Sequence, residues 1–406
     1  MTNQVKNEPE LRFPGFEGEW KENFISEVVD FYSGLTYSPD DITNEKGTFV
    51  IRSSNIKNNR LINADNVYVN LKNLKVENVD KGDIIVVVRN GSRKLIGKHA
   101  LVSTYLNNTV IGAFMTGIRS DYNFFINALL DTENFKRNIH MNLGATINQI
   151  TTGMFKKMKF YFPKNQEQQK IGDFFSKLDR QIELEEQKLE KLEEQKKGYM
   201  QKIFSQELRF KDGNGNNYSE WIKTNLKFLV SYKNGKGYEK EVVQNGKYNI
   251  INLNSISTKG MLKDSGKYSD FEDITLKKND LIMILSDVAK GNLIGKTAII
   301  DQDDKYLLNQ RVASLRIKDE STSNVLFIYY FINYFRQYFI NMSTGMSQLN
   351  INKSTVEDFL IYLPYIEEQD KIGNFFSNLD KSIIKQLDKI ELLKERKKGF
   401  LQKMFV

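Results

Sequence analysis

The 406-residue sequence predicts a mixed α/β (α+β) fold with two tandem, pseudo-repeated domains that are separated by two long helices. Three observations lead to this prediction: an internal repeat, a heptad pattern of apolar residues inside the repeated segments, and short β-rich runs between them. At about 100 to 200 residues per domain, the length agrees with two to four folding units. The predicted order is a first domain at 1–164, a helix at 165–206, a second domain at 207–364 and a second helix at 365–406.

The repeat is clearest in two segments that we predict to be helical. One copy begins at Pro163 and reads PKNQEQQKIGDFFSKLDRQI, and the other begins at Pro364 and reads PYIEEQDKIGNFFSNLDKSI, an offset of 201 residues without a gap. The same register continues to KKGYMQKIF at Lys196 and KKGFLQKMF at Lys397. A repeat of this length indicates that one structural unit occurs twice in the chain.

Apolar residues in both segments recur in alternating steps of four and three, which is the pattern of a heptad helix. They run from Ile171 to Ile203 in the first copy and from Ile372 to Met404 in the second. Polar residues interrupt the stripes at equivalent places, namely Glu185 and Lys196 in one copy and Gln386 and Lys397 in the other. Because the copies match in length and phase, the pattern favours pairing within one chain over a homodimeric zipper or separate amphipathic helices.

The two blocks between the helices predict mixed α/β domains. Runs of β-forming residues, broken by Asn, Gly, Ser and Lys, predict strands, and these runs are 48–52, 83–88, 248–253 and 280–285. Aromatic-rich stretches at 122–130 and 325–340 predict buried helices. The blocks also repeat faintly, because each opens on LRF followed by a tryptophan, at Leu11 and Trp20 and at Leu208 and Trp221.

Composition and motif spacing exclude several classes of enzyme. The chain has no cysteine, so it has no disulfide, thiolate zinc site or cysteine nucleophile, and its only histidines are His99 and His140. The segment GNLIGKT at Gly291 has three residues between its glycines where a phosphate-binding loop needs four. Pro39-Asp40 with Glu45-Lys46 is too loosely spaced for a nuclease site, and no Pro-Pro dipeptide supports a methyltransferase. We therefore expect no catalytic or metal site in this chain.

The net charge of +8 is compatible with a polyanionic partner and equally with a solubility feature. The sequence contains no run of about 18 apolar residues, and its start lacks the apolar stretch of a signal peptide. We therefore expect a cytoplasmic protein without a membrane partner.

Several loops are rich in side chains that contact DNA. Arg and Lys pair with guanine, Asn and Gln with adenine, and Ser, Thr and backbone N–H groups bind phosphates. In the first block the candidates are Arg52, Ser53, Asn55, Lys57, Arg89, Asn90, Ser92, Arg93, Lys94, Asn148 and Gln149. In the second block they are Lys233, Asn234, Lys236, Asn254, Ser255, Lys259, Lys290, Asn292, Gln310, Arg311, Ser347 and Gln348. The loops at 89–94 and 286–292 follow matching strands but differ in sequence, so we expect them to recognise two different half-sites. The alternative is that most of these residues lie in solvated loops without a specific role.

This organisation resembles the specificity subunit of type I restriction-modification systems, and the resemblance covers the whole chain. Its most specific part is P-x-x-x-E-Q-x-K-I-G-x-F-F-S-x-L-D, found from Pro163 to Asp179 and from Pro364 to Asp380. Each copy continues through the heptads to K-K-G-[YF]-[ML]-Q-K-[IM]-F. One small departure is Gln166, where the second copy has Glu367, and it leaves the heptads intact.

The resemblance implies two target recognition domains, Thr2 to Pro163 and Glu207 to Leu363, that each bind one half of a split DNA sequence. It also implies that the two helices form an antiparallel coiled coil, which acts as a spacer and docks methylation subunits. The expected partners are double-stranded DNA, two methylation subunits and restriction or translocase subunits. S-adenosylmethionine, ATP and Mg²⁺ are expected in those subunits and no cofactor in this chain. The alternatives are an autonomous DNA methyltransferase or nuclease, and a coiled-coil scaffold that does not bind DNA.

Overall fold

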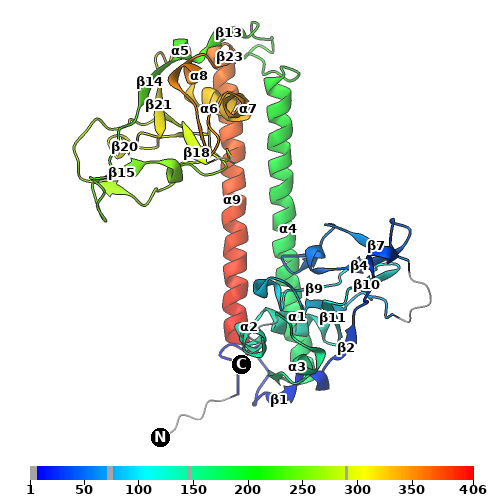
Figure 1. The fold of residues 1–406 in the computed structure, drawn as a ribbon. Helices are drawn as coiled ribbons and strands as arrows, with labels where there is room; N and C mark the ends of the chain where they lie inside the picture. Colours follow the sequence, from blue (N-terminus) through cyan, green and yellow to red (C-terminus); the bar gives the residue numbers. More distant parts are fainter. Residues whose placement is uncertain (1–6, 71–75, 144–147, 289–290) are drawn as a thin grey trace. The chain divides into compact units, whose positions relative to one another are not determined.

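The structure is a computed structural model that describes residues 7–70, 76–143, 148–288 and 291–406. The chain forms two compact units. Unit 1 consists of Met1–Gln187 together with Asp388–Val406, and unit 2 is Lys188–Leu387. Each unit therefore contains one sequence block, the beginning of the long helix that follows it, and the end of the other long helix (Figure 1).

Unit 1 is built from short strands and three short helices in its described part. The strands are β1 (Lys21–Phe24), β2 (Asp30–Ser33), β3 (Ile42–Thr43), β4 (Thr48–Ile51), β5 (Ile56–Lys57), β6 (Arg60–Leu61), β7 (Val67–Val69), β8 (Ile84–Val87), β9 (His99–Leu101), β10 (Thr109–Ile111), β11 (Met115–Arg119) and β12 (Lys159–Phe162). The α-helices are α1 (Asn123–Asp131), α2 (Glu133–Asn142) and α3 (Thr152–Lys156), and the 3-10 helices are η1 (Ile25–Glu27), η2 (Pro39–Asp41), η3 (Ser53–Asn55) and η4 (Arg93–Leu95).

The central sheet of unit 1 has the order β2-β11-β8-β9 with antiparallel neighbours. Its strand β8 has the sequence IIVV and is buried on both faces, which suits β-branched side chains. A second sheet, β10-β4-β7-β3, contains one parallel pair, β10 with β4. Thr132 immediately precedes helix α2, and its side chain accepts a hydrogen bond from the N–H of Phe135 and so caps the helix.

Unit 2 repeats this plan. Its strands are β13 (Ile222–Asn225), β14 (Val230–Asn234), β15 (Tyr248–Ile251), β16 (Tyr268–Ser269), β17 (Leu281–Ile284), β18 (Ser286–Val288), β19 (Thr297–Ile299), β20 (Tyr306–Leu308), β21 (Val312–Ile317), β22 (Gln348–Asn350) and β23 (Leu360–Leu363). Its short helices are α5 (Leu226–Leu229), α6 (Val325–Tyr334), α7 (Gln337–Asn341), α8 (Lys353–Glu357) and the 3-10 helix η5 (Leu253–Ser255). The sheet β14-β21-β17-β19 corresponds to the central sheet of unit 1, and the parallel pair β15 with β20 corresponds to β4 with β10.

The strands predicted at 48–52, 83–88, 248–253 and 280–285 are confirmed as β4, β8, β15 and β17. The predicted buried helix near 122–130 is confirmed as α1. The stretch 325–340 forms two helices, α6 and α7, because the backbone leaves the α-helical conformation at Phe335, where ψ is 19°. The adjacent Arg336 donates hydrogen bonds to the carbonyl oxygens of Gly291 and Asn292, at 2.8 and 3.2 Å. These bonds attach the break between α6 and α7 to the segment that precedes β19.

The two long helices are confirmed as α4 (Asn165–Phe204) and α9 (Ile366–Met404). In unit 1, the start of α4 and the end of α9 run antiparallel. Lys397 bonds Asp179 at 2.6 Å, and Lys394 bonds Glu186 at 2.7 Å. In unit 2, the end of α4 and the start of α9 run antiparallel in the same way, where Lys196 bonds Asp380 at 2.6 Å. The prediction of an antiparallel intramolecular coiled coil is therefore confirmed in both units.

Two of the polar interruptions in the heptads have a clear structural role. Lys196 and Lys397 are equivalent in the repeat, and each bonds the repeat-equivalent aspartate of the other helix, Asp380 or Asp179. A lysine at a core position is stable only with such a partner, so a shift of one helix along the other would leave both charges unpaired. The four residues therefore fix the register of the two helices.

Each unit also contains an arginine that binds a buried glutamate at the start of a long helix. The guanidinium of Arg12 donates to both carboxylate oxygens of Glu167 at 2.7 and 2.8 Å, and Arg209 does the same to Glu368 at 3.2 and 2.6 Å. These glutamates are 1% and 0% exposed, so their charges require a partner. The repeated LRF sequences thus anchor the beginning of each block to the helix that ends it.

Candidate nucleic-acid interface

Three loops of unit 1 that are far apart in sequence lie together. The side-chain amide of Asn90 donates to the hydroxyl of Ser53 at 3.0 Å, and that of Asn148 donates to the carbonyl oxygen of Gly91 at 3.0 Å. The backbone N–H of Asn90 also donates to the carbonyl of Asn148 at 3.2 Å. The turn after β4, the loop after β8 and the segment before α3 therefore form one surface.

The candidate residues of unit 1 divide by exposure. Those with exposed side chains are Lys57, Arg89, Ser92, Arg93 and Lys94, and those that are half-buried are Arg52, Ser53, Asn90, Asn148 and Gln149. The exposed group gathers mainly in the loop after β8, where η4 presents Arg93 and Lys94. Lys57 lies instead on the hairpin β5–β6, whose Arg60 binds Glu186 of α4 at 2.9 Å.

Unit 2 gathers its loops through the same kind of contacts. The N–H of Leu285 donates to the carbonyl of Arg311 at 3.0 Å, and the N–H of Ile351 donates to the carbonyl of Leu285 at 2.9 Å. Strands β18 and β22 pair, and the amide of Gln348 donates to the hydroxyl of Ser286. The loop after β17, the β20–β21 connection and the segment before α8 thus form one surface in unit 2.

Matching hydrogen bonds show that the two surfaces are equivalent. In unit 1, the N–H of Val88 donates to the carbonyl of Phe114 at 3.0 Å, and the N–H of Ile150 donates to the carbonyl of Val88 at 2.8 Å. These two bonds correspond to the two backbone bonds of unit 2. The sequence-based prediction that the loops after β8 and β17 are equivalent but different in residues is therefore confirmed, with Arg311 in the place of Phe114.

The candidates of unit 2 are mostly exposed. The exposed ones are Lys233, Asn234, Lys236, Asn254, Lys259, Asn292, Gln310, Arg311, Ser347 and Gln348. Three of them already bind a carboxylate: Lys236 bonds Asp273 at 2.9 Å, Lys259 bonds Glu193 at 2.6 Å, and Gln310 bonds Glu239 at 3.2 Å. Lys290 lies outside the described residues.

Two candidates are buried, and their polar groups are used inside the protein. Asn55 is 1% exposed, accepts from the N–H of Arg52 and donates to the carbonyl of Ala64 at 2.7 Å. Ser255 is 0% exposed, and its hydroxyl accepts from the N–H of Asn252 at 3.0 Å. Both residues close the 3-10 turns η3 and η5. We correct the candidate set by leaving them out of the proposed interface.

Phe114 is a surface residue that the sequence reasoning missed. It directly precedes strand β11, and its side chain is 52% exposed. The guanidinium of Arg89 lies over its ring, 4.9 Å from the ring centroid. Its counterpart Arg311 was among the predicted candidates. Aligning the two blocks strand by strand would therefore have identified the position of Phe114 as well.

A half-buried lysine occupies the same repeat position in each unit, Lys98 in unit 1 and Lys296 in unit 2. The ammonium of Lys98 is 3.5 Å from the carbonyl oxygen of Ser53, and burial lowers its pKa. The equivalent Lys296 of unit 2 has its pKa lowered to about 8 by burial, with contributions from the positive charges of Arg336 and Lys196. Desolvation disfavours the charged form of a lysine, and nearby cations act in the same direction.

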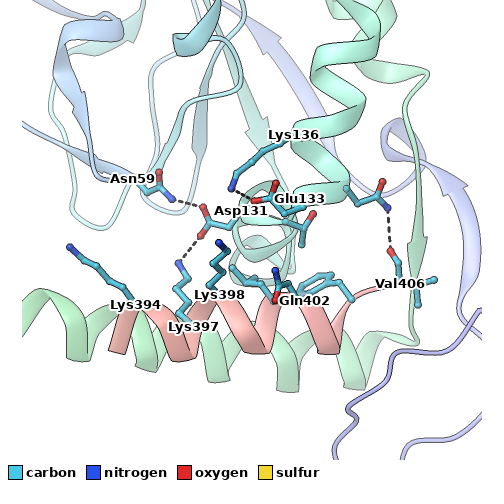
Figure 2. A pocket seen from close by; sticks show the side chains of 13 residues that line it. Asn59, Asp131, Glu133, Lys136, Lys394, Lys397, Lys398, Gln402 and Val406 are labelled. Atoms are coloured by element: carbon cyan, nitrogen blue, oxygen red, sulfur yellow. Dashed lines mark hydrogen bonds and ion pairs between the residues drawn. The ribbon is translucent and has the colours of Figure 1, made fainter. Parts of the chain in front are cut away.

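A buried charge cluster joins the recognition block of unit 1 to the helices. Figure 2 shows Asn59 and Lys397 pointing toward Asp131 beside a cavity of about 540 Å³, and Lys397 lies 2.6 Å from Asp131. Burial opposes the charge of Lys397, but Asp131 and Asp179 outweigh it and raise its pKa. Conversely, His99 and Lys397 overcome the effect of burial on Asp131 and lower its pKa. The two ion pairs of Lys397 link the end of α9 to Asp131 of α1 and to Asp179 of α4 within unit 1.

Within the described part of the chain, no group of three or more His, Asp or Glu side chains could hold a metal ion. None of the described helices is long and apolar enough to cross a membrane.

Comparison with known proteins matches both units to one family. The family model of the type I restriction modification DNA specificity domain matches residues 17–194 and 218–394. The chain is 24% identical over 269 residues to the type I restriction enzyme MjaVIII specificity subunit of Methanocaldococcus jannaschii, which covers 63% of each protein. It is 23% identical over 389 residues to the StySPI specificity subunit of Salmonella potsdam, covering 87% of this chain and 80% of that protein.

The fold is similar to a solved structure of the S subunit of a type I restriction-modification system from M. genitalium. The similarity covers 98% of this chain and 99% of that chain, with a TM-score of 0.66 at 16% sequence identity. The alignment with the M. jannaschii relative spans slightly less than two thirds of its length.

Proposed function

Since the chain belongs to the family of the type I restriction modification DNA specificity domain, we propose that it is the DNA-recognition subunit of a type I restriction-modification complex. It binds a bipartite DNA target, with one half-site bound by unit 1 and the other by unit 2. It performs no catalysis itself, and methyl transfer and cleavage belong to partner subunits.

One observation carries this proposal: both units assemble the same three loops into one surface with the same backbone hydrogen bonds, yet fill that surface with different residues. Two recognition surfaces with the same backbone structure and different side chains are suited to two different half-sites. Exposed arginine, lysine, asparagine and glutamine side chains supply the donors and acceptors that recognise base edges and phosphates.

The partners are double-stranded DNA and the other subunits of the complex. Two methylation subunits dock on the coiled coil, and restriction or translocase subunits join them. S-adenosylmethionine, ATP and Mg²⁺ act in those partner subunits. A cytoplasmic location stays a prediction from the sequence.

The test is to express the chain with a cognate methylation subunit and to map methylated adenines across the host genome. We expect methylation at one split sequence that has two defined half-sites and a spacer of undefined bases. The chain alone, incubated with DNA, S-adenosylmethionine, ATP and Mg²⁺, should neither methylate nor cleave it. Turnover by the purified chain, or methylation without a defined split sequence, would contradict the proposal.

A further inference from the structure

The side chain of Arg89 is stacked on an exposed aromatic ring in the candidate interface of unit 1. Its guanidinium carbon lies 4.9 Å from the centre of the Phe114 ring, within the range of a cation–π contact. The backbone holds the two residues together, because the N–H groups of Val88 and Arg89 both donate to the carbonyl of Phe114, at 3.0 and 3.2 Å. The stacking partner is therefore fixed relative to the base of the arginine side chain.

Phe114 is not accounted for by packing in a core. It is 52% exposed, and it does not belong to the hydrophobic clusters formed by the described residues of unit 1. An exposed aromatic ring is shielded from water only by the groups that pack on it. For Phe114, the guanidinium of Arg89 lies over one face of the ring.

The donors of Arg89 are unoccupied within the described part of the chain. No described carboxylate forms an ion pair with it, and no described group accepts a hydrogen bond from its guanidinium. By contrast, Arg12, Arg60 and Arg119 bond Glu167, Glu186 and Asp83, at 2.7, 2.9 and 3.0 Å. Stacking restricts the side chain without using its N–H groups, so Arg89 is held in place while its hydrogen-bonding edge stays free.

A planar guanidinium with a free edge matches the major-groove edge of guanine, where O6 and N7 accept two hydrogen bonds. The neighbouring amides of Asn90 and Asn148 are occupied by contacts within the loops. Arg93 lies in the same loop, and no aromatic ring of the described residues lies over its guanidinium. This suits contacts with phosphates, which need charge but little fixed orientation.

We propose that Arg89 recognises a guanine in the half-site bound by unit 1 and that Phe114 positions its guanidinium for this contact. The proposal rests on the proposed DNA-recognition function. It applies to unit 1 only, because Ser286 and Arg311 occupy the equivalent positions in unit 2, which therefore recognises its half-site with a different set of side chains.

The test uses the full chain in complex with a methylation subunit, bound to duplexes that carry the mapped target. Each guanine is replaced in turn by 7-deazaguanine, which lacks the N7 acceptor. We expect at least about a fivefold loss of affinity at one guanine in one half-site for the wild type. Arg89→Ala should bind weakly and show no further loss at that position. Arg89→Lys keeps a donor that can reach O6 and N7 but lacks the planar fork, so it should bind more weakly than the wild type and show a smaller response to 7-deazaguanine.

The role of Phe114 is tested by three substitutions. Phe114→Ala and Phe114→Leu should weaken binding about two- to fivefold and reduce the response at the same guanine only. Phe114→Tyr keeps the ring and should behave as the wild type. The matched control is Phe228→Ala, which removes a 65% exposed phenylalanine beside Lys227 in unit 2 and should change neither half-site. Arg93→Ala should weaken binding evenly over all positions.

The inference is wrong if Arg89→Ala keeps the wild-type response to 7-deazaguanine at every position. The positioning role is wrong if Phe114→Leu behaves as Phe114→Tyr. If the wild-type complex shows no sequence-specific methylation, the underlying DNA-recognition function is wrong instead.

Discussion

Replacing Lys397 with methionine should destabilise unit 1 by about 3 kcal/mol. The side chain of Lys397 is 14% exposed and bonds two carboxylates at 2.6 Å, Asp131 and Asp179, which are 12% and 34% exposed. Breaking a buried ion pair by removing one partner costs about 3 to 5 kcal/mol. We place the value at the lower end because Asp179 retains contact with water and methionine preserves the aliphatic packing of the lysine.

The repeat supplies a matched control. Lys196→Met removes the equivalent lysine of unit 2, which is 21% exposed and has one described carboxylate partner, Asp380, whose side chain is 28% exposed. We expect it to destabilise unit 2 by only about 1 to 2 kcal/mol. Adding Asp131→Asn to Lys397→Met should restore about 1 kcal/mol, because it removes one of the two uncompensated charges.

The assay is amide hydrogen exchange under native conditions, which gives a local free energy of opening for α1 and the end of α9 separately from the segments of unit 2. Urea unfolding of the same variants gives the global values. Unchanged exchange in α1 of Lys397→Met would refute the argument that the two ion pairs of Lys397 stabilise unit 1. An equal destabilisation by Lys196→Met and Lys397→Met would refute the argument that the second ion pair matters.

Three further predictions concern recognition, spacing and pH. Replacing Arg89, Arg93 and Lys94 together with alanine should weaken or alter only one half of the methylated sequence, since each bidentate base contact contributes about 1 to 3 kcal/mol; an unchanged methylome and affinity would count against these loops. Inserting one heptad in register into both long helices should lengthen each helix by about 10 Å and favour a DNA spacer about three base pairs longer. Binding should weaken and the half-sites should stay the same, and an unchanged spacer at full activity would contradict this prediction. Between about pH 8 and 10.5 the free energy of unfolding of the wild type should rise relative to that of Lys296→Met, because the unfolded chain still binds the Lys296 proton that the folded unit has released. Urea unfolding of both proteins across this range should show the difference growing by less than about 1.4 kcal/mol per pH unit, and a constant difference would contradict the prediction.

Much of the fold could be predicted because its signals are periodic and local. The heptads from Ile171 and Ile372 specify long helices whatever surrounds them, and the β-branched run of β8 specifies a buried strand. The repeat added what local patterns lack, since it identified the loops after β8 and β17 as equivalent before their contacts were known. The partner of each polar interruption in the heptads required the structure, because Lys397 and Asp179 are more than 200 residues apart.

Individual site residues were harder to predict, because composition does not determine which way a side chain points. Asn55 and Ser255 resemble their exposed neighbours in sequence, yet each turns inward to satisfy backbone groups of a 3-10 turn. Lys259 resembles a free basic residue, but it bonds Glu193, which belongs to a helix earlier in the chain. Phe114 was overlooked because an isolated phenylalanine beside a strand usually indicates a core position.

The discontinuity of unit 1 has a consequence for how the protein is made. Residues 188–387 form unit 2 as one continuous stretch, so it can fold as soon as they leave the ribosome. Unit 1 must wait for the end of α9, because the ring of Phe405 lies 6.1 Å from that of Trp20 and 5.4 Å from that of Phe125 in its core. At about 5 to 20 residues per second, that wait lasts roughly 10 to 40 seconds. Most of unit 1 is therefore synthesised before unit 2 but completes its folding after it, and until then its apolar core lacks the packing of Phe405.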